Sequence, residues 1–187
     1  MREHRDGRVA VLTLARPRQR NSLSEAAIRA LDAAMTRLSA DGTVAAIVIA
    51  AEGPAFSAGH DLKELAARRQ DADGGTAYFA QLMQLCAGMM MNIVNSPKPV
   101  IAAVEGVATA AGCQLVASCD LAVAGAGARF ATPGVNIGLF CSTPMVALSR
   151  NVSRKRAMEM LLLGELLGAE EAADWGLVNR VVPAGQA

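Results

Sequence analysis

The chain has 187 residues, with 18 basic and 17 acidic side chains and a net charge of +1. This balance excludes the broad basic surface that dominates nucleic-acid affinity, so no nucleic-acid partner is expected. No stretch approaches 18 uninterrupted apolar residues, and the first residues lack the apolar segment of a signal peptide. We therefore expect a single soluble, cytoplasmic domain over residues 1–187 with no membrane partner.

The cysteine and histidine content argues against a metal site. None of the four cysteines belongs to a C-x-x-C pair, and His4 and His60 are the only histidines. Structural zinc sites need four such ligands at characteristic spacings, so no metal is expected. The cysteines are predicted to be reduced residues of the core.

The first half of the chain predicts strands and helices in alternation. A strand is expected at 9–14, and Ser22 with Glu25 matches a capping box that opens a helix ending near residue 41. The apolar run 44–50 predicts a strand covered on both faces. The Gly-rich loop 52–61 precedes a helical tract that is interrupted at 71–75 and resumes at 76–95, with its methionines in the core.

The second half repeats this alternation. Strands are predicted at 100–104, 121–124 and 178–182, and a small-residue turn after Gly106 leads into a short helix. Further helices are predicted at 154–163 and 169–175, each stopped by a glycine. The alternation indicates an α/β domain, although no repeat is visible in the sequence itself.

Two segments carry a family resemblance. The first is residues 55–65 (AFSAGHDLKEL), and the second runs from 99–106 (PVIAAVEG) through 111–115 (AGCQL) to Cys119 and Asp120. Shorter supporting pieces are RP at 16–17, NSL at 21–23, FATP at 130–133 and AADWGLV at 172–178. As an ordered set they resemble the crotonase (enoyl-CoA hydratase/isomerase) superfamily.

The resemblance implies a fold and an assembly. The fold would be a crotonase-like α/β spiral of repeated ββα units. Members of the family continue into helices that cover the acyl pocket and build trimers, and this C-terminal helical trimerisation subdomain is expected to be absent or not included. A homotrimer or a dimer of trimers is the implied assembly.

The resemblance also implies a binding site for the thioester of an acyl-CoA substrate, with no permanently bound cofactor. The backbone N–H groups of His60 and Ala111 would form an oxyanion hole, in which fixed donors stabilise an enolate-like state. The family usually has Gly at position 111. Substrate contacts are implied for Arg18, Arg20, Asn21, Ser22, Leu23, Ser57, Ala58, Gly59, Asp61 and Leu62.

Two of these assignments have a second interpretation from the residues alone. The cluster of Arg16, Arg18 and Arg20 suits a phosphorylated small molecule, but it is equally typical of a solvated turn. A histidine in a Gly-rich loop is a candidate acid or base, because its ordinary pKa lies near neutrality. The resemblance assigns the role of His60 to its backbone instead.

The sequence departs from the family at both catalytic carboxylates. Hydratases of the family use two glutamates, and here Gln114 and Gly134 occupy those positions. This Gln/Gly pattern resembles the enoyl-CoA hydratase domain-containing branch, which is also found in mitochondria. Losing one general acid or base typically costs about 10²–10⁴ in rate. The candidates to replace the two glutamates are Asp61, Glu64, Glu105 and Asp120, and Ser142 and Thr143 are expected as polar residues lining the site. For the four carboxylates a structural role is favoured over a catalytic one.

Three functions remain open from the sequence. The first is an enzyme, a lyase or isomerase of fatty-acid metabolism, that acts on acyl-CoA mainly through the oxyanion hole. The second is a non-catalytic acyl-CoA-binding or regulatory homologue. The third is a structural protein that binds no CoA ester. No G-x-S-x-G elbow or Ser-His-Asp set supports unrelated hydrolase chemistry.

Overall fold

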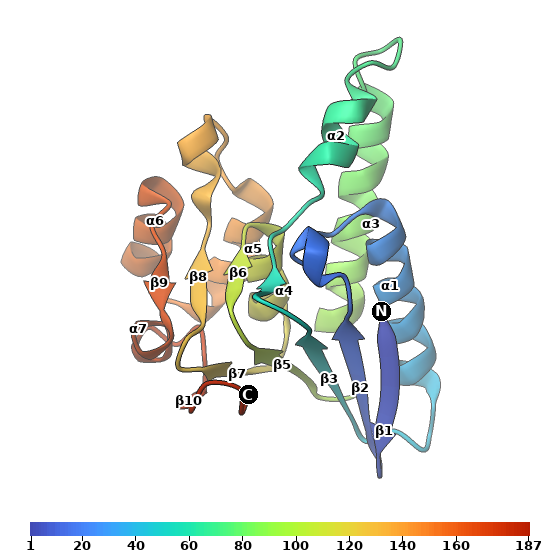
Figure 1. Cartoon of the computed structure of the whole chain (residues 1–187), viewed down its shortest axis with the longest axis vertical. Coiled ribbons are helices and arrows are strands. Elements are labelled where there is room, and N and C mark those ends of the chain that lie inside the picture. The colour runs from blue at the N-terminus through green and yellow to red at the C-terminus, as the bar shows by residue number, and fades with distance from the viewer.

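The computed structural model describes all 187 residues, which form two sheets and a set of helices (Figure 1). The larger sheet has the strand order β1 (Arg2–Asp6), β2 (Val9–Leu14), β3 (Ala46–Ala51), β5 (Val100–Val104), β7 (Leu121–Gly125), β10 (Arg180–Val182). All of its neighbouring strands are parallel except β1 and β2. The smaller sheet has the order β4 (Ala55–Ser57), β6 (Val107–Thr109), β8 (Arg129–Ala131), β9 (Leu167–Gly168), with β9 antiparallel to β8.

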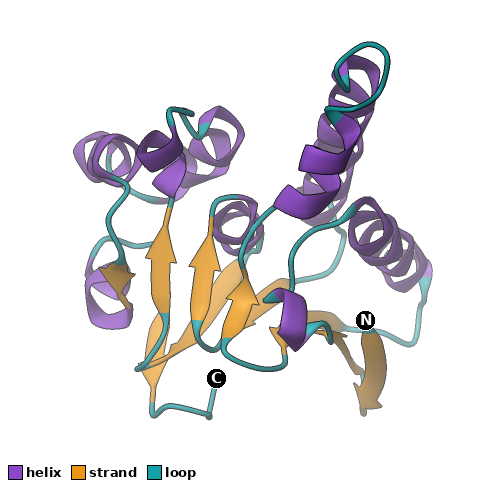
Figure 2. Ribbon diagram, turned by 45° about the horizontal axis from the view of Figure 1, so that its top comes forward, coloured by secondary structure: helices purple, strands orange, loops and turns teal.

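Most of the helices lie along one side of the strands, and short ones lie beside or in front of them (Figure 2). The helices are η1 (Pro17–Gln19), α1 (Glu25–Ala40), α2 (Leu62–Arg68), α3 (Thr76–Val94), α4 (Ala111–Ser118), η2 (Pro133–Ile137), α5 (Ser142–Asn151), α6 (Arg154–Leu163) and α7 (Ala169–Asp174).

The chain winds as a spiral of ββα turns. Successive turns place β3, β5 and β7 side by side in the larger sheet, and β4, β6 and β8 side by side in the smaller one. The helices α2 and α3 follow the first pair of strands, α4 follows the second, and η2 and α5 follow the third. The predicted α/β spiral is confirmed. Because β4, β6 and β8 are parallel, the connections that follow them all begin at the same end of the smaller sheet.

The core follows the predicted apolar patterns. Along β2 every second residue is buried, and the predicted face of α1 (Ile28, Leu31, Met35, Leu38) is fully buried. By length and composition α3 could cross a membrane, yet it packs against α1. It buries Met89 and Met90 as predicted, whereas Met91, also predicted to lie in the core, is exposed. All four cysteines are free and buried, as predicted.

The structure corrects the predicted start of the first long helix. Its N-cap is Ser24, whose Oγ accepts the N–H of Ala27 at 3.3 Å, so the capping box of Ser22 and Glu25 is wrong. Ser22 is free for another task and donates its hydroxyl to Asp61 at 2.9 Å. Local spacing suggested the box, but a contact 39 residues away along the chain decides where Ser22 points.

Several elements were not predicted from the sequence. The segment 52–61, expected to be a loop, contains β4, and β6 and β8 are equally short. Strand β1 has five exposed residues, all polar or charged, so no apolar alternation marks it. Charged side chains on an edge strand disfavour pairing with another chain.

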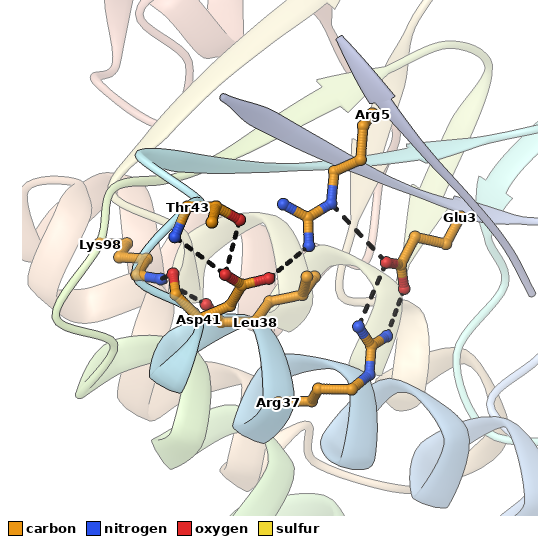
Figure 3. Close-up of polar contacts among 7 residues, drawn as sticks. All are labelled: Glu3, Arg5, Arg37, Leu38, Asp41, Thr43 and Lys98. Carbon is orange, nitrogen blue, oxygen red and sulfur yellow. Dashed lines mark hydrogen bonds and ion pairs between the residues drawn. The ribbon is translucent and has the colours of Figure 1, made fainter. Parts of the chain in front are cut away.

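A polar network joins the β1 edge to the end of α1 (Figure 3). Asp41, the C-cap of α1, accepts bonds from the Thr43 backbone N–H and hydroxyl and from Arg5 at 2.7 Å. These hydrogen bonds hold the pKa of Asp41 well below its ordinary value, and the bond from the Thr43 hydroxyl has the largest effect. Lys98 donates to the carbonyls of Leu38 and Asp41, which satisfies acceptors that every helix end leaves free.

Gly112 is a packing requirement of the spiral. A Cβ built there would lie 2.2 Å from the Ser57 carbonyl oxygen, so α4 rests directly on the backbone of β4. We expect Gly112→Ala to lower the free energy of unfolding by about 1–3 kcal/mol, because neither backbone can yield easily. Urea denaturation of the purified chain measures this.

Gly88→Ala is the matched control. Gly88 lies inside α3 with no atom within 4 Å of a built Cβ. Alanine there should stabilise the helix by about 0.5–1 kcal/mol. Equal stability changes in the two variants would contradict the contact between α4 and β4.

Candidate active site

Two backbone segments meet at one edge of the smaller sheet. One is the loop between β4 and α2, and the other is the turn between β6 and α4. Gly59, in the first, has φ +82°, and a Cβ built on it would lie 2.9 Å from the Ala110 Cβ and 3.1 Å from the Ala111 nitrogen. Only glycine permits this approach, which places His60 and Ala111 next to each other.

The N–H groups of His60 and Ala111 have no backbone acceptor. Leu23 forms a parallel bridge with His60, in which the Leu23 N–H donates to Gly59 at 2.8 Å and its carbonyl accepts from Asp61 at 3.4 Å. This pattern leaves the His60 N–H unused. Ala111 is the first residue of α4, where an N–H has no partner within the helix and the helix dipole favours an anion. Neither of these N–H groups therefore has a backbone partner, and both residues line the same cavity.

The turn that presents Ala111 is strained. Ala110 has φ 52° and ψ −122°, a conformation that side-chain-bearing residues rarely adopt. Its N–H donates to Ala131 at 2.9 Å and its carbonyl accepts from Gln114 at 3.0 Å, so it is held from both sides. Backbone strain of this kind persists where the surrounding structure enforces it, and it is common at functional sites. No sequence pattern marked Ala110.

Buried polar side chains fix the loop that carries His60. Asn21 donates to the carbonyls of Glu52 (2.9 Å) and Ala55 (2.7 Å), and its Oδ1 accepts the Arg16 N–H at 2.8 Å. Ser57, fully buried, donates to the Asn21 carbonyl at 2.9 Å and accepts the Gly59 N–H at 3.3 Å. The side chains of these two predicted substrate-contact residues therefore hold the segment 16–21 against the segment 52–59.

Asp61 starts α2. Its Oδ1 accepts the N–H groups of Lys63 and Glu64 at 3.1 and 3.3 Å, and its Oδ2 accepts from Ser22. Burial alone would raise the pKa of Asp61, but the bonds from Ser22 and the two amides outweigh it and lower that pKa. An ionised carboxylate fully used in this way makes a poor proton acceptor.

A cavity of about 550 Å³ opens beside the two free N–H groups. Its predominantly apolar walls come from α2 and α3 on one side and from the segment between η2 and α5 on the other. The apolar wall residues are Leu62, Leu65, Met83, Ile137, Leu139 and Phe140. Of these only Leu62 was predicted from the sequence, because the other wall residues look like ordinary core positions until the fold brings them together.

The cavity contains no carboxylate. Among its 18 lining residues the only titratable side chains are His60 and Cys141, and the hydroxyls of Ser142 and Thr143 also line it. Gln114 is buried nearby in α4, and its Oε1 has no hydrogen-bond partner. Gly134 lines the cavity directly.

Packing explains the glycine at 134. A Cβ built there would lie 2.3 Å from the Leu139 carbonyl oxygen and 2.7 Å from the Cys141 Sγ. The Gly134 carbonyl accepts the Leu139 N–H at 2.9 Å, and its N–H donates to Cys141 at 3.3 Å. The segment 139–141 therefore occupies the space that a glutamate side chain at position 134 would need.

The carboxylates named as possible substitutes have structural roles. Glu64 accepts the Glu25 N–H at the start of α1 at 3.0 Å, and Asp120 accepts the Val100 N–H at 2.8 Å. Glu105 accepts the N–H groups of Gly185 and Ala187 at 2.9 and 3.0 Å. With Asp61 used as a helix cap, none of the four lines the cavity.

Titration of the buried groups follows from their surroundings. Burial lowers the pKa of His60, while the Leu23 carbonyl and the charge of Glu64 act in the opposite direction. Burial raises the pKa of Cys113 to about 12 and of Cys86 to about 11, so these thiols stay neutral. No group of three His, Cys, Asp or Glu side chains is placed to hold a metal ion.

A second cavity, of about 850 Å³, adjoins the first. The two share Ala58, Thr109, Pro133 and Asn136 among their walls, and the second also contains Arg20. Arg20 is exposed in the left-handed conformation that ends η1. Arg18 is exposed as well but lines neither cavity.

Comparison with known proteins agrees with this geometry. The enoyl-CoA hydratase/isomerase family matches residues 4–187. The chain belongs to this family. It is 53% identical over 175 residues to mouse enoyl-CoA hydratase domain-containing protein 3, mitochondrial, a match that covers 94% of this chain and 57% of that protein. The chain thus spans little more than half the length of this relative.

Solved structures show the same fold. The crystal structure of human enoyl-CoA hydratase domain-containing protein 3 is 49% identical, with a TM-score of 0.91 over 97% of this chain and 70% of that chain. An enoyl-CoA hydratase from Mycobacterium smegmatis is 55% identical, with a TM-score of 0.90 over 97% of this chain and 69% of that one. The predicted resemblance is confirmed at the level of family and fold.

The contact at Gly134 leads to a test of the cavity wall. We expect Gly134→Ala to displace the segment 139–141 and to increase iodoacetamide labelling of Cys141 several-fold, because the new methyl group overlaps Leu139 and Cys141. Peptide mass spectrometry measures the labelling. Cys86, Cys113 and Cys119 serve as internal controls, since general unfolding would expose them too. Gly127→Ala, with open space around its Cβ, should change nothing. Unchanged labelling of Cys141 would refute the packing argument.

Proposed function

We propose that this enoyl-CoA hydratase-like chain binds an acyl-CoA and holds the thioester carbonyl between the N–H groups of His60 and Ala111. The observation that carries the proposal is the close approach of Gly59 to Ala110 and Ala111, beside an apolar cavity that both His60 and Ala111 line. Membership of the family supports the choice of ligand. The coenzyme enters as part of the substrate, so no permanent cofactor is needed.

The adjoining cavities suggest how the coenzyme lies. The acyl chain would occupy the 550 Å³ cavity, and the pantetheine would pass Ala58 into the larger one. Arg20 stands there as a phosphate ligand, because guanidinium groups bind phosphate oxygens through paired hydrogen bonds. This favours Arg20 over Arg18 of the two arginines predicted from the sequence.

The chemistry that the site supports is enolate stabilisation. Negative charge develops on the carbonyl oxygen when the neighbouring carbon loses a proton, and each fixed donor is worth about 3 kcal/mol there. This chemistry is that of lyases and isomerases acting on acyl-CoA, which is the enzyme class that we propose for this chain. A non-catalytic binder has the same oxyanion hole, and turnover separates the two. The cytoplasmic location and the trimeric assembly stay predictions, and the mitochondrial names of relatives bear weakly against the former.

Binding can be tested through the carbonyl itself. We expect butyryl-CoA, labelled with ¹³C at the thioester carbonyl, to bind with micromolar affinity by calorimetry. Its carbonyl stretch should move to lower frequency in the infrared difference spectrum, because the two N–H donors polarise the bond. Ala111→Pro removes one donor at a helix position that tolerates proline, and should reduce the shift. Ala111→Gly, which keeps the N–H, is the control.

The outcomes separate the possible functions. If the unaltered chain binds butyryl-CoA without a shift of the carbonyl stretch, the oxyanion hole is refuted and only a CoA-binding site remains. No binding at all would favour the structural protein. Circular dichroism establishes that Ala111→Pro is folded, and the shift in the unaltered chain tests the proposal without that variant.

Hydration is a separate question with its own prediction. We expect crotonyl-CoA hydration by this chain to be slower than by a two-glutamate hydratase by at least about 10⁴, since each missing acid or base costs about 10²–10⁴. Gln114→Glu alone should recover little, because position 134 has no room for the second carboxylate. Loss of the crotonyl-CoA absorbance measures the rate. Substantial hydration by the unaltered chain would contradict the claim that the carboxylates matter.

A further inference from the structure

We propose that the imidazole of His60 is the base that removes a proton from the carbon next to the thioester carbonyl. The inference rests on the proposed function, because it needs an acyl-CoA held by the His60 and Ala111 N–H groups. It goes further in naming a catalytic side chain and a reaction class: proton transfer at the α-carbon, without addition of water.

The first argument is elimination within the cavity. Its lining includes no Asp, Glu, Lys or Arg, so an acid or base must come from His60 or Cys141. Asp61, Glu64, Glu105 and Asp120 are committed to backbone N–H groups elsewhere. Gln114 has no proton to exchange near neutral pH, because an amide neither gains nor loses one there.

The second argument is the state of the imidazole. Its Nδ1 is buried without a hydrogen-bond partner, whereas Nε2 has no partner and is not buried. Because His60 lines the cavity, we assign Nε2 as the ring nitrogen that meets a ligand there. Burial keeps the ring neutral, and a neutral imidazole is the form that accepts a proton.

The third argument is position. The carbonyl oxygen would be bound by the backbone of the same residue that carries the base, and the α-carbon is one bond from the carbonyl carbon. His60 also lies in a loop that Asn21 and Ser57 hold from beneath. A base fixed on a rigid loop near the reacting bond meets the geometric condition for proton transfer.

The proposed step balances without another reactant. The α C–H bond breaks, a bond forms between that proton and Nε2, and the electron pair moves to the carbonyl oxygen as an enolate. The two N–H donors stabilise the enolate. Return of a proton, or of a deuteron taken up from solvent by the imidazolium, restores the thioester. The observable result is exchange of α-protons, and with a suitable acyl group isomerisation or epimerisation.

Butyryl-CoA in D₂O isolates this step, because a saturated acyl chain cannot be hydrated. We expect the unaltered chain to exchange its α-protons, followed by ¹H NMR, and His60→Gln to reduce the rate by at least about 10². Calorimetry with butyryl-CoA should show similar affinity for both, since glutamine keeps the backbone donor. His4→Gln, at the exposed histidine of β1, is the matched control and should leave exchange unchanged.

Two further measurements exclude a merely structural role. Added imidazole should restore exchange to His60→Ala, which a variant with a damaged loop would not allow. The rate should be level at neutral pH and fall on acidification below the ordinary histidine pKa, as the ring takes up a proton. Glu64 is the charged group that acts on the ring, and it opposes the effect of burial; Cys141 is the other titratable residue that lines the cavity.

The possible failures are distinguishable. No binding of butyryl-CoA overturns the proposed function itself. Binding without exchange overturns the base and leaves a non-catalytic binder. Exchange that survives His60→Gln but is lost in Cys141→Ser assigns the proton transfer to the thiol and refutes the role of His60.

Discussion

The contact between Gly59 and the turn at Ala110 and Ala111 is the constraint on which the site depends. It joins two loops from successive turns of the spiral, and a single methyl group on Gly59 would force them apart. The fold supplies both loops by the same mechanism, since β4 and β6 are parallel neighbours whose ends lie at one edge. Asn21, Ser57 and the Leu23 bridge then fix the first loop, while the Ala131 carbonyl fixes the second. The proposed oxyanion hole therefore depends on backbone packing, and its donors are largely independent of side-chain identity.

The two catalytic carboxylates of a hydratase differ from these backbone donors, because they are side chains and depend on the residue at each position. At position 134 their absence is built into the packing: the Leu139 carbonyl and the Cys141 thiol lie where a side chain would begin. At position 114 the change is isosteric, and a buried amide oxygen without a partner remains. Glycine at position 134 is accompanied by packing that leaves no room for a side chain, whereas glutamine at position 114 removes a negative charge. A return to two-glutamate chemistry would consequently require movement of the segment 139–141 as well as two substitutions.

Much of this was accessible from the sequence, and the remainder has identifiable causes. Long elements with strong apolar periodicity, such as the helix containing Ile28 and Leu31, were predicted apart from a displaced N-cap. The three-residue strands β4, β6 and β8 were not, because their length gives no periodic signal. The two hole residues came from a family resemblance. The positive φ of Ala110, the closed space at Gly134 and the true partner of Ser22 depend on contacts between distant segments. Local sequence carries no information about such contacts.

The proposed hole is a feature of the backbone, whereas the proposed base is a side chain. The backbone donors belong to His60 and to the start of α4, and Gly59 allows their two segments to approach each other. The base can then change with little disturbance to the hole, provided that some titratable group still faces the cavity. Here the cavity lining retains an imidazole and a thiol, and burial lowers the pKa of the imidazole, which favours its neutral form. A pocket without carboxylates is thus compatible with proton transfer, although it is poorly suited to activating water with a paired acid and base.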